Sequence, residues 1–126
     1  MTIAHSAAFA LAAGLLLAAQ AAEAAGNAEN GGKIFRRCEI CHAIRAGEPN
    51  RIGPSLYGLF DREAGKAPGF SYSANLAKAD FKWDDAKLDK WLANPQAFLP
   101  GARMAFRLTN PQEREDIVAY LHQAAK

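Results

Sequence analysis

The chain of 126 residues has little of several features that define common classes of small protein. Cys38 and Cys41 are its only cysteines, which is too few for a disulfide framework. The formal net charge is only +2, and a nucleic-acid-binding domain usually carries a denser basic patch. No apolar run of strand length alternates with a period of two. These absences predict a single small all-α domain that does not bind nucleic acid.

The two cysteines belong to a C-x-x-C-H pattern over residues 38–42, which is the attachment signature of a c-type haem. In this pattern both thiols add to the porphyrin vinyl groups, and the adjacent histidine binds the iron. A zinc site would need two further ligands, and a thioredoxin-like site would need a βαβ context that is not visible. The pattern therefore predicts one covalent haem c, held by Cys38 and Cys41, with His42 as an axial ligand of the iron.

The first 24 residues are typical of a secretory signal peptide. Residues 7–19 form an unbroken apolar run, and Ala22 and Ala24 place small residues where a signal peptidase reads them. We predict cleavage after Ala24, which leaves a domain of residues 25–126 that is exported to the periplasm. The alternative is an uncleaved membrane anchor, but the run is shorter than the roughly 20 apolar residues that a spanning helix needs. We therefore expect a protein that is not membrane-embedded.

The second axial ligand follows by elimination once the signal peptide is set aside. Met104 is then the only thioether, and His122 is the only imidazole besides His42. His122 lies about 100° off the apolar stripe of the last predicted helix, so we interpret it as a solvated surface residue. Met104 lies in a loop between two helix signals, where the alternative interpretation is a flexible core filler. Together with the haem motif, this position favours ligation by Met104, which raises the reduction potential.

Helix signals lie at both ends of the predicted domain and in its second half. Three-to-four spacing predicts an opening helix with Ala28, Gly31, Phe35 and Cys38 on one face. Two further helices are predicted to begin after the N-caps Asp84 and Asn110, and Asn94-Pro95 is predicted to end the first of these. Residues 47–69 are rich in Gly and Pro and have no helical period. A loop of this length is usually functional, so we expect it to wrap around the haem.

Several further motifs resemble the class I c-type cytochromes, the group of bacterial cytochrome c2 and mitochondrial cytochrome c. Residues 31–35 resemble the opening helix of this family, and Tyr120-Leu121 resembles the closing helix that crosses it. Residues 53–60 resemble the loop whose proline, here Pro54, accepts a hydrogen bond from the ligand histidine. The resemblance implies a small all-α fold in which the N- and C-terminal helices cross and long loops wrap around a covalently bound haem.

The resemblance also implies roles for individual side chains. Arg62, Tyr72 and Trp83 match the residues that hydrogen-bond the haem propionates, and Phe106 matches a residue that packs at the haem edge with Pro54. Three of the lysines on the mitochondrial docking face are replaced here by Gln96, Ala97 and Arg103. A basic docking surface can be supplied instead by arginines, and the alternative is that these are ordinary solvated charges: Arg36, Arg37, Arg51, Arg103 and Arg107.

The resemblance implies a soluble, monomeric one-electron carrier of a respiratory or photosynthetic chain, and not an enzyme. It would take electrons from a membrane cytochrome bc complex or another donor, and pass them to a terminal oxidase or a photosynthetic reaction centre. Docking would be weak and fast, at the haem edge near Arg37, Arg51 and Arg103. Two alternatives stay open. One is the dedicated electron acceptor of a periplasmic dehydrogenase. The other is a haem enzyme or gas-binding cytochrome with a labile sixth ligand.

Overall fold

The computed structural model describes residues 26–126, so the predicted signal peptide and its cleavage site lie outside the described residues. This part of the chain contains no β-strand, only an isolated antiparallel bridge between Glu63 and Lys82. The prediction of an all-α fold is confirmed. None of the helices within this range has the length and apolar character needed to cross a membrane. The helices are α1 (Ala28–Phe35), α2 (Ala74–Ala77), α3 (Asp85–Ala93), α4 (Pro95–Phe98) and α5 (Pro111–Ala124).

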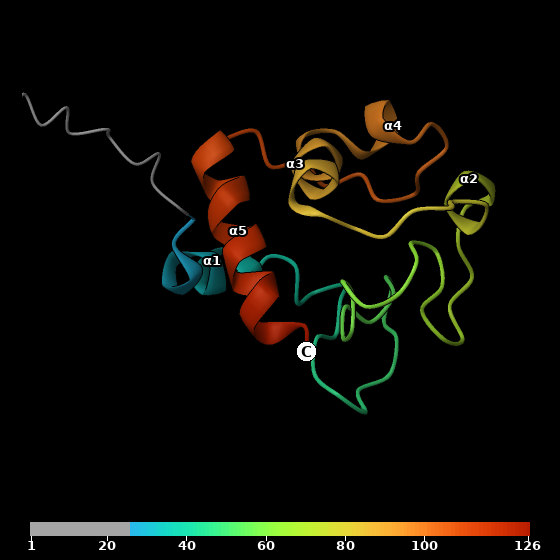
Figure 1. The fold of residues 1–126 in the computed structure, drawn as a ribbon, viewed down its shortest axis with the longest axis horizontal. Helices are drawn as coiled ribbons and strands as arrows, with labels where there is room; N and C mark the ends of the chain where they lie inside the picture. Colours follow the sequence, from blue (N-terminus) through green and yellow to red (C-terminus); the bar gives the residue numbers. More distant parts are fainter. Residues whose placement is uncertain (1–25) are drawn as a thin grey trace, which may run out of the picture.

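Helices α1 and α5 cross in direct contact although they lie at opposite ends of the described chain (Figure 1). The crossing is so close that a Cβ added at Gly31 would lie 2.0 Å from the carbonyl oxygen of Asp116. One turn further along α1, the buried ring of Phe35 packs on Tyr120 with 5.2 Å between ring centroids. A glycine on the buried face of α1 is therefore required by the approach of the α5 backbone.

The opening helix ends earlier than its apolar spacing predicts. Helix α1 stops at Phe35, and residues 36–41 continue as turns. Here the backbone forms short i→i−3 hydrogen bonds, including Cys38 N–H to the carbonyl oxygen of Phe35 at 2.7 Å. Because these turns are tighter than an α-helix, Cys38 lies beyond the helix and not on its face. The expectation for Cys38 was therefore wrong in this detail.

Two short helices, α2 and α4, are absent from the sequence-based prediction. As predicted, Asp84 caps α3, because its side chain accepts a hydrogen bond from the Lys87 N–H at 2.8 Å. Asn94 ends α3, but its side chain also accepts from the Ala97 N–H at 3.3 Å and so caps α4. The Asn94-Pro95 pair therefore ends α3 and begins α4, since asparagine at the N-cap followed by proline at the next position favours a new helix.

The long loop over residues 47–69 contains only turns and the single bridge at Glu63, as the sequence predicts. Asn50 holds its two halves together. The Asn50 amide nitrogen donates to the carbonyl oxygen of Pro68 at 2.9 Å, and its amide oxygen accepts from the Ser55 N–H at 2.8 Å. This side chain replaces the backbone pairing that a strand or helix would supply.

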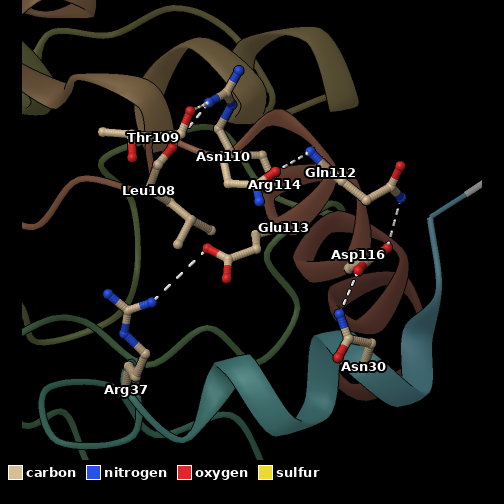
Figure 2. A network of polar contacts seen from close by, with 9 residues as sticks. All are labelled: Asn30, Arg37, Leu108, Thr109, Asn110, Gln112, Glu113, Arg114 and Asp116. Carbon is tan, nitrogen blue, oxygen red and sulfur yellow. Dashed lines mark hydrogen bonds and ion pairs between the residues drawn. The ribbon is translucent and has the colours of Figure 1, made fainter.

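Asp116 is a buried carboxylate at the crossing of α1 and α5, with 2% of its surface exposed. Figure 2 shows it between the two helices, where it accepts from the Asn30 amide at 2.6 Å and the Gln112 amide at 3.0 Å. The backbone N–H of Asn27 adds a third hydrogen bond at 2.7 Å. Burial raises the pKa of this carboxyl, but the three hydrogen bonds outweigh that effect and hold its pKa below the usual range.

We predict that Asp116→Asn makes the protein less stable at pH 7 by about 1–3 kcal/mol, because one amide N–H₂ group then faces donors that need an acceptor. The deprotonated form of Asp116 makes the network, so its contribution is present above the unfolded pKa of about 3.9 and declines as pH falls through the lower native value. Guanidinium unfolding from pH 7 to pH 3 should show that the difference in unfolding free energy between wild type and Asp116→Asn becomes smaller in acid. Glu115→Gln, at an exposed neighbouring residue, is the control. A difference that stays constant with pH would contradict the prediction.

Candidate functional site

The C-x-x-C-H segment folds as a compact turn that brings both cysteines to one place. The Cys41 and His42 N–H groups donate to the carbonyl oxygen of Cys38 at 3.0 Å and 2.9 Å. Both cysteines are free and half-buried. Burial raises the pKa of Cys38 to about 11, although the nearby Arg37 opposes the rise, so this thiol is neutral at physiological pH.

The imidazole of His42 is fixed in orientation and protonation by the loop that follows it. Its Nδ1 lies 2.7 Å from the carbonyl oxygen of Pro54, and a carbonyl can only accept, so Nδ1 carries the hydrogen. Burial lowers the pKa of His42, and the Pro54 bond offsets this only in part, so the ring is neutral. Nε2 therefore presents a free lone pair, which is the form that binds a metal.

Gly53 allows this imidazole to lie against the backbone. A Cβ added at Gly53 would lie 2.4 Å from Cε1 and 2.7 Å from Nδ1 of His42. The Gly53 N–H also donates to the carbonyl oxygen of Cys41 at 2.8 Å, which ties the loop to the C-x-x-C-H turn. The position of His42 thus depends on the absence of a side chain at residue 53.

Two of the three side chains that the resemblance assigns to the haem propionates, Arg62 and Tyr72, form hydrogen bonds with nearby backbone groups. Arg62 donates through Nη2 to the carbonyl oxygen of Ser55 at 2.7 Å and through Nη1 to that of Tyr57, which uses only part of its set of five donors. Tyr72 accepts from the Ala67 N–H at 3.0 Å, so its own hydroxyl hydrogen is still available.

Trp83, the third of these residues, belongs to an aromatic cluster that anchors α3 and α4. Its ring is buried and packs edge-on against Trp91 with 5.4 Å between centroids. Phe81 and Phe98 complete the cluster, at 5.3 Å and 6.0 Å from the Trp83 ring. The contacts with Trp91 and Phe81 are edge-to-face and the contact with Phe98 is tilted, and together they restrict the orientation of the indole.

Ser73 is not among the site residues that the sequence predicts. Its side-chain oxygen is buried and has no hydrogen-bond partner among residues 26–126. Ser73 occupies the N-cap position of α2, but its hydroxyl does not cap the helix. An unpaired buried hydroxyl is costly unless a bound group supplies a partner. The only feature of the sequence that could have pointed to Ser73 as a site residue is its position next to Tyr72.

Met104 and Phe106 are half-buried and pack against the hydrophobic core. The Met104 carbonyl oxygen accepts a hydrogen bond from the side-chain amide of Gln96 at 2.7 Å. The guanidinium of Arg37 lies over the Phe106 ring, 4.9 Å from its centroid. The segment that carries Met104 is thus fixed from two sides, by α4 and by the turns after α1.

His122 is exposed, as predicted, but it has partners. Its Nε2 lies 2.7 Å from Oδ1 of Asp85, and its ring stacks on Phe60 with 4.0 Å between centroids. Residues 26–126 contain no group of three or more histidine, cysteine or acidic side chains placed to hold a metal ion. A zinc site at the two cysteines would therefore lack the further ligands it needs from this part of the chain.

The five arginines proposed for docking are all exposed, but they differ in their contacts. Arg37 lies 4.0 Å from the carboxylate of Glu113, as Figure 2 shows. Arg51 donates to the carbonyl oxygen of Glu39 at 2.5 Å, and Arg103 donates to that of Ser71 at 3.2 Å. For the other two, no side-chain hydrogen bond or ion pair is formed with any described residue: Arg36 and Arg107.

An all-α domain that joins a C-x-x-C-H turn to a fixed, neutral histidine defines a class of protein, the carriers of covalently bound haem. The family model for cytochrome c matches residues 28–125. The chain is 40% identical over 103 residues to cytochrome c of Arabidopsis thaliana, covering 80% of this chain and 92% of that protein. It is 41% identical over 101 residues to cytochrome c2 of Rhodomicrobium vannielii, covering 79% and 81%. The chain belongs to the cytochrome c family.

Proteins of this family carry covalently bound haem c and transfer electrons, and they are not enzymes. The described residues fit that cofactor. Cys38 and Cys41 offer two free thiols on one turn, and His42 presents a neutral Nε2. The Ser73 hydroxyl is buried without a partner among residues 26–126, so its hydrogen-bonding capacity is unused by the protein itself.

We predict that Gly53→Ala displaces the His42 imidazole, because the added methyl group would occupy space that the ring now fills. Overpacking of this kind costs about 1–3 kcal/mol. Guanidinium unfolding of the haem-loaded protein should show this loss together with a change in the axial-ligand spectrum. Ile52→Ala is the control, because Ile52 is the adjacent residue and its side chain is 79% exposed. A wild-type spectrum and stability in Gly53→Ala would show that the ring has room to move.

Proposed function

We propose that the protein is an exported, periplasmic, monohaem electron carrier with His42 and Met104 as the axial ligands of the iron. The family membership supports the electron-carrier role. The observation that carries the ligand assignment is the hydrogen bond from His42 Nδ1 to the Pro54 carbonyl oxygen at 2.7 Å, which leaves Nε2 for the iron. When bound, the haem supplies an iron that changes between Fe(III) and Fe(II).

The role of the chain is to fix the cofactor and its surroundings. Cys38 and Cys41 would hold the haem covalently, while Arg62, Tyr72 and Trp83 would bind its propionates. Arg62 and Tyr72 both retain hydrogen-bond donors beyond those used inside the protein. With both axial positions filled by protein ligands, no place is left for a substrate, so the chain would pass electrons at the haem edge.

The proposed partners are redox proteins that dock at this edge. A membrane cytochrome bc complex would be the donor, and a terminal oxidase or photosynthetic reaction centre the acceptor. The exposed arginines support a basic docking face, which favours fast association with an acidic partner surface. The predicted signal peptide over residues 1–24 and the relative named cytochrome c2 support export to the periplasm.

The ligand assignment is tested at Met104. We predict that the oxidised protein shows the weak far-red charge-transfer band of methionine sulfur bound to Fe(III), and that Met104→Ala abolishes it. Met104→His should restore a low-spin spectrum with a lower reduction potential, since imidazole stabilises the oxidised iron better than a thioether does. Persistence of the far-red band in Met104→Ala would show that the band does not arise from Met104 and would overturn this ligand assignment.

Docking is tested at Arg107, whose side chain is exposed and forms no hydrogen bond or ion pair with any described residue. We predict that Arg107→Glu slows electron transfer to a purified terminal oxidase on the order of tenfold at low ionic strength, because it removes an attractive charge and adds a repulsive one. The difference should shrink as salt screens charges beyond about 8–10 Å. Lys126→Glu makes the same change at the C-terminus. Equal slowing in both variants would argue against a localised docking face.

A further inference from the structure

The segment from Leu99 to Phe106 has no regular secondary structure beyond turns, yet side-chain hydrogen bonds tie it to three other parts of the chain. The Asn75 amide on α2 donates to the carbonyl oxygen of Pro100. Arg103, within the segment, donates to the carbonyl oxygen of Ser71 at 3.2 Å. The third contact comes from Gln96, and it is the one that reaches Met104 directly.

Gln96 makes two hydrogen bonds through one nitrogen. Its Nε2 lies 2.7 Å from the carbonyl oxygen of Met104 and 3.4 Å from that of Ala102. Both partners are carbonyl oxygens, which only accept, so the amide nitrogen and not the amide oxygen must face the segment. The orientation of the Gln96 side chain is therefore fixed by its partners.

Gln96 itself is held in place by α4. Asn94 caps this helix, and Pro95 is among the most buried side chains of the described chain. Phe98, at the other end of α4, packs on Trp91 with 6.5 Å between ring centroids. A four-residue helix anchored at both ends is a rigid platform for the half-buried Gln96 side chain between them.

We propose that Gln96 is a positioning residue that holds the backbone of Met104 and thereby opposes displacement of the Met104 side chain by a competing ligand. This inference rests on the proposed axial role of Met104. A side chain can leave a metal only if its backbone can move or its own torsions change, and the bond to Gln96 restricts the first of these. Glutamine is uncharged, so the restraint does not depend on pH.

The experiment is an imidazole titration of the oxidised, haem-loaded protein at pH 7, followed by loss of the methionine-to-iron band. Gln96→Leu removes the donor at similar side-chain volume and unchanged net charge. We expect it to bind imidazole about five- to tenfold more tightly than wild type, because one net hydrogen bond no longer opposes the opening of the segment. Gln96→Glu, which lacks an N–H donor when ionised, should behave in the same way and serves as the second loss variant.

Gln96→Lys keeps a donor of similar reach, and its ammonium group is protonated at pH 7. We expect its imidazole affinity to stay close to that of wild type. Gln123→Leu is the matched control, because Gln123 is exposed on α5 and its replacement should leave the affinity unchanged. A residue that only contributed to global stability would change guanidinium unfolding without this pattern of imidazole binding.

Each result decides a different point. Unchanged imidazole affinity in Gln96→Leu and Gln96→Glu would overturn the positioning role. Raised affinity in Gln96→Lys as well as in the two loss variants would also overturn it, because packing and not hydrogen bonding would then be responsible. If wild-type protein lacks the methionine-to-iron band, the axial role of Met104 is wrong, and this inference is withdrawn with it. A normal wild-type band with no effect of Gln96 would refute this inference alone.

Discussion

The crossing of α1 and α5 at Gly31 is the central packing contact of the domain. It joins the two ends of the domain, and a side chain at residue 31 would collide with the α5 backbone. The buried Asp116 then links both helices by hydrogen bonds to Asn27, Asn30 and Gln112. Because the C-x-x-C-H turn follows directly from α1, the same contact fixes where the cysteines and His42 lie relative to the closing helix.

Between these helices, the chain relies on side chains to satisfy backbone groups that helices and strands would otherwise pair. Asn50, Arg62, Asn75 and Gln96 each donate to a carbonyl oxygen in a loop. Such bonds contribute only about 1 kcal/mol each in net terms, but several of them act on the same loops. The loops that carry Pro54 and Met104 are therefore held in one arrangement, and a cofactor site on loops requires such restraint.

The parts of this structure that sequence could predict depend on neighbours along the chain. Asp84 and Asn110 identify helix starts because capping involves residues two or three positions away, and the haem motif is confined to residues 38–42. The burial of the Ser73 hydroxyl and the hydrogen bonds of Gln96 could not be predicted, since both arise from segments brought together by folding. Helix α4 could be predicted only in part. Asn94-Pro95 carries the same helix-start signal as Asn110-Pro111, but the helix is too short to show a periodic apolar face.

Arg37 shows how one residue can serve both the interior and the surface. Its guanidinium contacts the Phe106 ring at 4.9 Å and lies 4.0 Å from Glu113, so it links the turns after α1 to the Met104 segment and to α5. An exposed ion pair contributes about 0–1 kcal/mol, and an exposed cation–π contact contributes about 0.5–1 kcal/mol. The charge of Arg37 remains accessible to solvent, because 53% of its side chain is exposed. In the proposed electron carrier, Arg37 would attract an acidic partner while it packs on Phe106, so a change at this residue would alter both docking and the position of the Phe106 ring. Arg107 forms no hydrogen bond, ion pair or cation–π contact with a described side chain, so a substitution at Arg107 tests docking without removing such a contact.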